Sequence, residues 1–187
     1  MPVKAQGFSL LETLIAMSIS SVLLLGAARM LPALHLGVMQ QTQQVTLQED
    51  LWQLAFTLGK HLQRAGYCNG VCTGAALTVS PDGQCMIVQW DENSNGRFEA
   101  ASADKAEQTG YRLSEQSLET QRGATRCAGK GWEKLTDPQK VRVDLFSVQR
   151  QNRSGLPPLL TIRLAVTPLR YGGAPVSVEH TVAGYNL

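Results

Sequence analysis

The feature that most constrains this chain is an apolar segment close to its amino terminus. Residues 8–28 are rich in Leu, Ile, Val, Met and Ala, and Glu12 is the only ionisable side chain between Lys4 and Arg29. A helix of about 20 residues spans about 30 Å, which is close to the hydrocarbon thickness of a bilayer. The segment is therefore predicted to cross a membrane once.

The charges beside this segment indicate its orientation. Lys4 and the amino terminus lie on its short side, so the positive-inside rule favours a cytoplasmic amino terminus and an exported carboxy-terminal body. Arg29, on the other side, weakens this bias.

Three interpretations of the segment compete: a cleaved secretory signal, a plain single-pass anchor and a prepilin signal. A secretory signal places its small-residue cleavage site after the apolar run, and residues 29–35 (Arg-Met-Leu-Pro-Ala-Leu-His) are a poor site of that kind. The small residue Gly7 instead precedes the run. This position favours a leader that is cut before the apolar segment.

Residues 7–12, Gly-Phe-Ser-Leu-Leu-Glu, resemble the G-F-[ST]-L-[ILV]-E signature of type IV pilins and type II secretion pseudopilins. The resemblance implies that prepilin peptidase cuts between Gly7 and Phe8 on the cytoplasmic side and methylates the new amino terminus at Phe8. Residues 1–7 would then be a leader peptide, and residues 8–28 would remain as the transmembrane and filament-core helix.

Glu12 would occupy the fifth position of the mature chain. A carboxylate at the centre of a membrane helix is unfavourable by about 2.5–3.5 kcal/mol, and by less near an interface. The resemblance implies that Glu12 pairs with the amino group of Phe8, its own or that of a neighbouring subunit, during subunit assembly. The alternative is that Glu12 reaches the lipid headgroups and pairs with nothing specific.

The helix is predicted to continue beyond the membrane through residues 29–66. Pro32 is expected to kink or interrupt it, because proline removes a backbone hydrogen bond. Farther along, apolar residues recur at helical spacing and predict a face packed on a sheet, with Gly66 as the carboxy-terminal cap. This stripe comprises Leu47, Leu51, Leu54, Leu58, Leu62 and Ala65.

Residues 67–187 are predicted to form an exported, β-rich head. Strands are expected at 86–90, 141–148, 159–167 and 176–183, and turns at 152–155 and 172–175 make the last three an antiparallel meander. Residues 102–134 should hold loops and one or two short strands, around 111–113. The predicted fold class is α+β: a long amino-terminal helix packed on an antiparallel β-sheet head, the lollipop arrangement of pilins.

The four cysteines all lie in the part predicted to be exported, so disulfides are expected. Their spacing lacks the paired cysteines and histidines of a zinc site. Pairing of Cys68 with Cys72 and of Cys85 with Cys127 is favoured because residues 69–71 can turn tightly, but the sequence leaves all three connectivities open.

Residues 91–99 resemble the start of an EF-hand calcium loop. Asp91, Asn93 and Asn95 stand at loop positions one, three and five, with glycine at six. Position twelve is Ser102, so the bidentate glutamate is missing, and Glu99 at position nine could replace it only with a different geometry. An Asx-type turn without metal is the favoured alternative. Apart from this calcium hypothesis, no cofactor is expected.

Composition and motifs argue against catalysis and nucleic-acid binding. The formal net charge is +2 and no long run of like charges occurs, so no nucleic-acid partner is expected. His35, His61 and His180 are scattered, and neither G-x-S-x-G nor H-E-x-x-H is present. The chain is not expected to be an enzyme.

Residues 64–67, 111–113 and 131–135 look similar to the J-type pseudopilin and W-type minor pilin group. This resemblance implies a minor pilin or pseudopilin of the inner membrane that enters, or primes assembly of, a type IV pilus or a type II secretion pseudopilus. Its partners would be other minor pilins or pseudopilins, the major pilin, prepilin peptidase and an inner-membrane assembly platform. The alternative is a membrane-anchored periplasmic binding or calcium-responsive domain that never polymerises.

Overall fold

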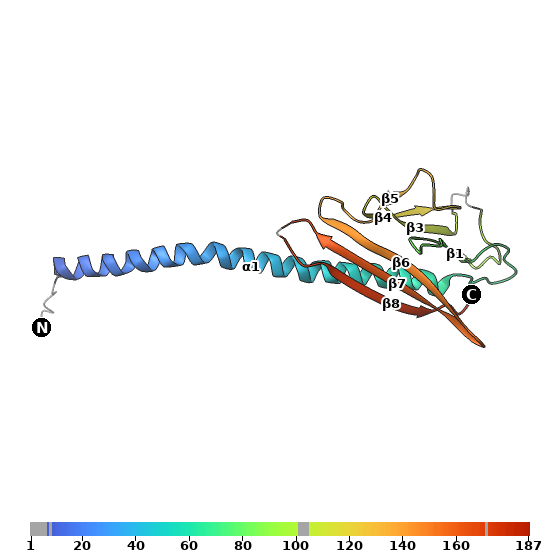
Figure 1. Ribbon diagram of the computed structural model, residues 1–187, viewed down its shortest axis with the longest axis horizontal. Coiled ribbons are helices and arrows are strands. Elements are labelled where there is room, and N and C mark those ends of the chain that lie inside the picture. Colours follow the sequence, from blue (N-terminus) through green and yellow to red (C-terminus); the bar gives the residue numbers. More distant parts are fainter. Residues whose placement is uncertain (1–6, 8, 101–104, 171) are drawn as a thin grey trace, which may run out of the picture. The chain divides into compact units, whose positions relative to one another are not determined.

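The computed structural model describes residue 7 and residues 9–100, 105–170 and 172–187. The chain divides into two compact units, Met1–Thr42 and Gln43–Leu187. Helix α1 (Leu10–Arg64) contributes to both units, and every strand belongs to the second unit (Figure 1). The α+β fold class, with one long amino-terminal helix packed on antiparallel sheets, is confirmed.

Helix α1 is continuous, contrary to the predicted interruption at Pro32. Proline lies inside the helix and removes only one backbone hydrogen bond, which the helix tolerates. Ser9 begins the helix: its backbone carbonyl accepts the N–H groups of Glu12 and Thr13 at 3.1 and 3.2 Å, and its hydroxyl also accepts the Glu12 N–H at 3.3 Å. This is the arrangement expected of a serine N-cap.

The head contains two antiparallel sheets, whereas the sequence predicted one. The first has the order β1-β2-β3-β4-β5 and the second the order β6-β7-β8. The strands of the first sheet are β1 (Leu77–Val79), β2 (Cys85–Gln89), β3 (Gln108–Ser114), β4 (Ser117–Arg122) and β5 (Glu133–Lys134). Those of the second are β6 (Val141–Arg153), β7 (Leu156–Pro168) and β8 (Val176–Ala183).

The meander predicted for the last three strands is confirmed, although its first hairpin is longer than expected. Strands β6 and β7 run to Arg153 and Leu156, which are register partners, so Ser154 and Gly155 alone form the turn. Gly155 has a φ of 68°, a conformation that glycine adopts without strain. Side chains along β7 alternate between buried and partly exposed, as a strand with one face on the core requires.

The polar stretch 102–134 is more regular than predicted. It holds the β3–β4 hairpin, whose turn consists of Glu115 and Gln116 at φ values of 46° and 60°. Two successive positive φ values suit a tight hairpin, but Asn and Gly are the residues that usually adopt them. The sequence therefore did not predict this turn, and it did not predict strand β1.

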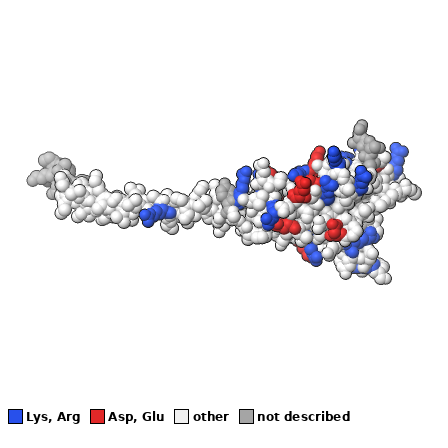
Figure 2. Space-filling view, turned by 45° about the horizontal axis from the view of Figure 1, so that its top comes forward, with Lys and Arg blue, Asp and Glu red and all other residues white. Residues whose placement is uncertain are grey.

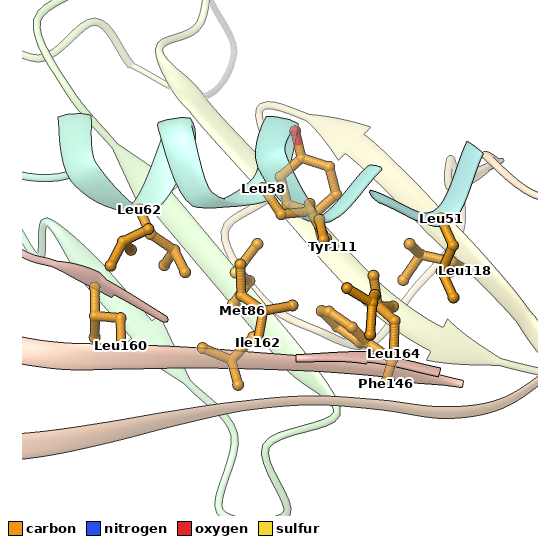
Figure 3. Close-up of a cluster of buried hydrophobic side chains, with 14 of the residues drawn as sticks. Leu51, Leu58, Leu62, Met86, Tyr111, Leu118, Phe146, Leu160, Ile162 and Leu164 are labelled. Carbon is orange, nitrogen blue, oxygen red and sulfur yellow. The ribbon is translucent and has the colours of Figure 1, made fainter. Parts of the chain in front are cut away.

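The predicted leucine stripe lies at the centre of the head. Leu58, Leu62 and Ala65 are fully buried, Leu51 is 4% exposed, and Leu47 and Leu54 pack against the same cluster. The opposing surface comes from both sheets and includes Met86, Leu118, Phe146, Leu160, Ile162 and Leu164 (Figure 3). The second half of α1 is thus a core element of the head.

Gly66 follows the last turn of α1, where the sequence predicted a cap. Its φ is 84°, and a Cβ atom there would lie 2.2 Å from the backbone oxygen of Asn186. Its N–H donates to the carbonyl of Gln89 at 2.9 Å, and the Asp91 N–H donates to the carbonyl of Tyr67 at 2.9 Å. These bonds fix the exit of the helix to the end of β2.

Candidate functional site

The predicted processing site lies just before α1. Gly7 is exposed and outside regular structure, and, apart from its two chain neighbours, no described atom would lie within 4 Å of a Cβ added to it. Residues 1–6 and Phe8 lie outside the described residues, as does the loop residue Ser102. An exposed backbone ahead of a helix is a segment that a protease can bind in extended form.

The first part of α1 presents apolar side chains on all sides. Every residue from Leu10 to Leu36 is exposed, including Leu23, Leu24 and Leu25 at 66–70%. By length and composition this helix can cross a membrane. A helix that is apolar all round requires lipid or other protein around it, since water alone leaves the apolar surface uncovered.

Polar groups within this apolar segment fall into two classes. The hydroxyls of Thr13, Ser18 and Ser21 each donate to the backbone carbonyl three residues earlier, at 2.8 Å. These bonds satisfy the hydroxyls within the helix itself. The carboxylate of Glu12 is different: within the described part of the chain it has neither a hydrogen bond nor an ion pair. It is the one carboxylate among the described residues of this segment, and its charge calls for an external partner.

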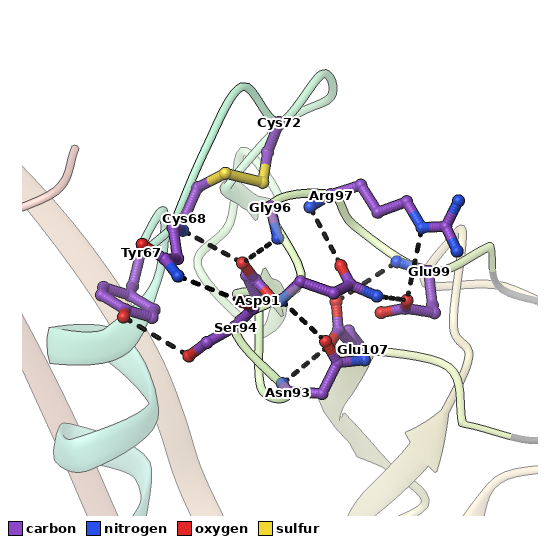
Figure 4. Close-up of a disulfide and its surroundings, with 12 residues drawn as sticks. Tyr67, Cys68, Cys72, Asp91, Asn93, Ser94, Gly96, Arg97, Glu99 and Glu107 are labelled. Atoms are coloured by element: carbon purple, nitrogen blue, oxygen red, sulfur yellow. Dashed lines mark hydrogen bonds and ion pairs between the residues drawn. A yellow bond between two sulfur atoms is a disulfide. The ribbon is translucent and has the colours of Figure 1, made fainter.

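Two disulfides fasten the loops of the head. Cys68 is bonded to Cys72 in the segment that follows α1, and Cys85 of β2 is bonded to Cys127 in the loop between β4 and β5. This is the pairing that the sequence favoured. The first disulfide lies beside residues 91–99, because the N–H of Asn69 donates to the Asp91 carboxylate at 3.0 Å (Figure 4).

In the predicted calcium loop, residues 91–99, most of the candidate ligand oxygens accept hydrogen bonds from backbone N–H groups. The carboxylate of Asp91 accepts the N–H groups of Asn69, Asn95 and Gly96 at 2.9–3.0 Å. The side-chain oxygens of Asn93 and Asn95 accept N–H groups two residues farther along, at 2.9 and 3.1 Å. These are Asx-type turns, the alternative that the sequence favoured. Calcium binding by these four candidates, Asp91, Asn93, Asn95 and Glu99, stays a prediction.

Acidic groups around this loop have shifted pKa values. Burial raises the pKa of Asp91, but the backbone N–H bonds to its carboxylate outweigh this and hold the pKa below its usual range. Burial also raises the pKa of Glu107, and a hydrogen bond with Glu99 raises it further. The pKa of Glu99 is lowered, mainly by the hydrogen bond from Asn95 and then by the one with Glu107. A proton between the two glutamates therefore resides on Glu107.

Comparison with known proteins places the chain in a family. The family model for prepilin peptidase-dependent protein B matches residues 40–184, and the prokaryotic N-terminal methylation motif matches residues 3–28. Prepilin peptidase-dependent protein B of Escherichia coli (strain K12) is 51% identical over 187 residues, which cover 100% of both chains. The chain belongs to the prepilin peptidase-dependent protein B family.

Membership of the prepilin peptidase-dependent protein B family confirms the sequence-based assignment to type IV pilin-like proteins. The methylation motif spans Gly7, Phe8 and Glu12, and the longer match begins within α1 and covers nearly all of the head. No solved structure matches the chain.

Sequence reasoning missed the polar contacts that hold the head together. Glu107 is 4% exposed, and its carboxylate accepts the N–H groups of Glu92, Asn93 and Glu99 at 2.8–3.3 Å, so it fixes the 91–99 loop to the start of β3. Glu92, Asn93 and Glu99 precede Glu107 by 15, 14 and 8 residues, and no helical or strand spacing indicates such contacts.

A second missed contact joins α1 to the first sheet. The hydroxyl of Tyr111 and Nδ1 of His61 are 2.6 Å apart, and the His61 ring packs against Trp90 at a tilt of 47°, with 5.0 Å between ring centroids. Burial lowers the pKa of His61, with a further contribution from Arg64, and burial raises the pKa of Tyr111 to about 12. Both groups are therefore neutral at pH 7.

A third missed cluster holds the loop that carries Cys127. The guanidinium of Arg112 forms an ion pair with Glu119 at 2.8 Å, donates to the carbonyl of Cys127 at 2.8 Å, and lies 4.4 Å from the ring centroid of Trp132. These contacts hold the loop beside the Cys85–Cys127 disulfide.

On the face shown in Figure 2, charged side chains of both signs are interspersed over the head.

Proposed function

We propose that this chain is made as a prepilin and acts as a minor pilin or pseudopilin. Prepilin peptidase removes residues 1–7 and methylates Phe8, and the mature subunit enters, or primes assembly of, a type IV pilus or type II secretion pseudopilus. Its role is to bind other subunits, and it carries no catalysis of its own. Within this proposal, residues 8–28 are the anchor and filament core, 29–66 the amphipathic continuation and 67–187 the exported head.

The observation that carries the proposal is the continuous exposed apolar helix with one unpartnered carboxylate near its start. A helix of this kind is stable in a bilayer and equally in a bundle of like helices, because both cover its whole circumference. Glu12 favours the bundle over the bilayer, since an amino group on a neighbouring subunit would neutralise it. Membership of a family named for prepilin peptidase supports the processing step.

The proposed location follows from the same segment. The mature amino terminus faces the cytoplasm, the helix crosses the inner membrane and the head folds in the periplasm, where two disulfides can form. Proposed partners are prepilin peptidase, an inner-membrane assembly platform, other minor pilins or pseudopilins and the major pilin.

Intact mass spectrometry of the full chain, co-expressed with or without prepilin peptidase, tests the proposal. With the peptidase, the mass should fall by residues 1–7 and rise by one methyl group. Gly7→Leu should block this change, and Gly26→Leu should leave it intact. Apart from the chain neighbours and the adjoining helix backbone, no described atom lies within 4 Å of a Cβ added to either glycine, so both positions have open space for a side chain.

An unchanged amino terminus in the presence of the peptidase would overturn the proposal. It would favour the alternative of an anchored periplasmic domain that does not polymerise. Loss of processing in both Gly7→Leu and Gly26→Leu would show that bulk anywhere in this segment, and not recognition of Gly7, controls the cut.

A further inference from the structure

The second sheet of the head ends at strand β8, whose outer edge forms no backbone hydrogen bond with any described residue. The N–H of Gly184 donates to the carbonyl of Pro158 at 3.0 Å, one step beyond the register pairs of β8 and β7. Alternate residues of an antiparallel strand bond to the same neighbour, so the even-numbered residues of β8 bond to β7. The backbone groups that point outward, called here the β8 edge, are those of Ser177, Glu179 and Thr181.

The other sheet edges of the described head are short or covered. Strand β1 has three residues and β5 has two, and short edge strands offer few groups for pairing. On the outer edge of β6, the N–H groups of Val143 and Val148 donate to carbonyls in the turns of the first sheet, at 2.8 and 2.9 Å. The β8 edge is therefore the one long edge that the described residues leave open.

Strand β8 also lacks the features that protect an exposed edge from pairing. Proteins protect such edges with lysine, proline or bulges. Strand β8 has eight residues without Lys, Arg or Pro, and its register with β7 has no shift. Its one carboxylate, that of Glu179, forms an ion pair with Arg163 of β7 at 2.7 Å, so its charge is offset within the sheet. An edge of this kind pairs readily with another strand.

Two exposed aromatic side chains of α1 lie beside β8. The Phe56 ring meets the His180 ring edge to face, with 4.8 Å between centroids, and the Trp52 ring is 5.6 Å from that of Phe56. A Cβ atom at Gly59 would lie 2.7 Å from the His180 ring, so the helix contacts the strand directly there. Phe56 is nevertheless 50% exposed and Trp52 36%. The aromatic pair is therefore on the open side of the last strand.

We propose that the β8 edge binds an extended segment of another pilin-like subunit, which adds a strand to the second sheet. Main-chain hydrogen bonds would hold the segment, and an apolar side chain on its helix-facing side would cover Phe56 and Trp52. Lys60, one helical turn beyond Phe56, has no ion pair within the described parts of the chain and favours an acidic residue on the added segment. The inference rests on the proposed function, because it requires neighbouring subunits.

A second copy of this chain fits the β8 edge less well. The His180 ring lies beside Phe56. Farther along both segments, the side chain of Asn186 donates to the carbonyl of Gln63 at 3.4 Å, so β8 and the second half of α1 run in the same direction (Figure 1). Antiparallel pairing of two β8 strands would point their two helices in opposite directions, whereas subunits anchored in one membrane enter it in one direction. Parallel pairing about a twofold axis would turn the polar face of one β8 toward the aromatic pair of the other.

Amide hydrogen exchange of the full chain in membranes tests the proposal. The chain is measured alone and after co-expression with pilin-like subunits from the same genome, one at a time. In the chain alone, the amides of Ser177, Glu179 and Thr181 should exchange fast and those of Val178 and His180 slowly, because only the second set bonds to β7. Incorporation should slow the exchange of the first set at least about tenfold.

Substitutions at Thr181 test the same edge by cross-linking of the full chain to the co-expressed subunit. Thr181→Pro removes an outward N–H that the sheet does not use, and edge strands tolerate proline. It should lower the cross-linked fraction about tenfold. Thr181→Val is the matched control: it also loses the hydroxyl contact with Thr161 but keeps the N–H, so it should retain the cross-link. Phe56→Ala, which leaves the β8 edge intact, should lower the fraction about threefold.

Incorporation of the wild-type chain with its three edge amides still exchanging fast would overturn the proposal, and this readout needs no variant. Equal loss in Thr181→Pro and Thr181→Val would also overturn it. Slow exchange of the edge amides in the chain alone, reversed at lower expression, would make a second copy the occupant and contradict the proposal. Intact mass separates this inference from the proposed function: a chain that is neither processed nor cross-linked fails the proposed function, whereas a processed and incorporated chain without edge protection fails this inference alone.

Discussion

Helix α1 contributes to both units of this chain, but its side chains are exposed in the first unit and partly buried in the second. In the first unit, every residue from Leu10 to Leu36 is exposed, and most are apolar. In the second, Leu51, Leu58 and Leu62 of the same helix are at most 4% exposed, and polar residues lie between them. The described residues leave the first part of the helix exposed, whereas the second part packs against two sheets.

This contrast indicates where the stability of each unit comes from. The head has its own core, two disulfides and a network of buried polar contacts. The described part of the first unit is held by hydrogen bonds within its helix, and its exposed apolar surface depends on a membrane or other subunits. Changes in the head should therefore alter its unfolding, and changes in the first unit should alter insertion or assembly.

Removal of the Cys85–Cys127 disulfide should have the largest effect on the head. The two cysteines are 42 residues apart, so the bond excludes many unfolded conformations, and Cys85→Ser with Cys127→Ser should lower the free energy of unfolding by about 4 kcal/mol. Denaturant unfolding of the full chain in micelles, followed by tryptophan fluorescence, measures this change.

The second disulfide provides the comparison. Cys68 and Cys72 are only four residues apart, so their double Ser variant should lower the free energy of unfolding by about 2 kcal/mol. Equal losses from the two pairs would show that contacts around the bonds, such as those of Arg112, matter more than the length of chain that each bond closes.

Truncation of a buried leucine on α1 should have the next largest effect. Leu62 is fully buried, so Leu62→Ala should lower the free energy of unfolding of the head by about 3 kcal/mol, through lost burial and the cavity left behind. Leu24→Ala, on the same helix but at a residue 70% exposed, should leave head unfolding unchanged. A comparable loss in Leu24→Ala would contradict the separation of the two units.

Several features of the molecule could be predicted because they depend on local spacing. The apolar run and the processing signature lie in consecutive residues, and the leucine stripe repeats with the helical period. Strand β7 was predicted for the same reason, since its buried residues alternate. The disulfide pairing rested on the tight turn that residues 69–71 allow.

Other features depend on contacts between distant segments and could not be predicted. The Glu115-Gln116 turn has the backbone of a tight hairpin without Asn or Gly, so the hairpin was missed although a short strand was predicted around residues 111–113, within β3. The division of the head into two sheets depends on which strands pair. Glu107 acquires its role only when loop and strand are brought together. Continuity of α1 through Pro32 depends on the helix on either side of it.

Replacement of Glu12 tests the first unit. If Glu12 pairs with the amino group of a neighbouring subunit, Glu12→Gln should lower incorporation into assemblies roughly tenfold, which corresponds to about 1.4 kcal/mol. Glu12→Asp, which keeps the charge, should retain more of it. Cross-linking of the full chain to co-expressed pilin-like subunits in membranes gives the incorporated fraction. Unfolding of the head should be the same in all three proteins.

The smallest expected effect is the pH dependence contributed by His61. Burial and then Arg64 lower its pKa in the folded head below the ordinary value of 6.5, so the unfolded chain binds the proton more readily. The free energy of unfolding should therefore fall as the pH drops from about 6.5 through the lower folded pKa, and should gain nothing from His61 above that window.

His61→Gln isolates this contribution. Glutamine does not titrate and can still form a hydrogen bond with the Tyr111 hydroxyl, so the contact between helix and sheet has a replacement. Glu107, whose pKa is raised, contributes the opposite slope over part of the same range, but it does so in both proteins and cancels in the difference. The difference in unfolding free energy between wild type and variant should change with pH only below about 6.5. A difference that is flat from pH 7 to pH 5 would show that His61 is as accessible to protons in the folded head as in the unfolded chain.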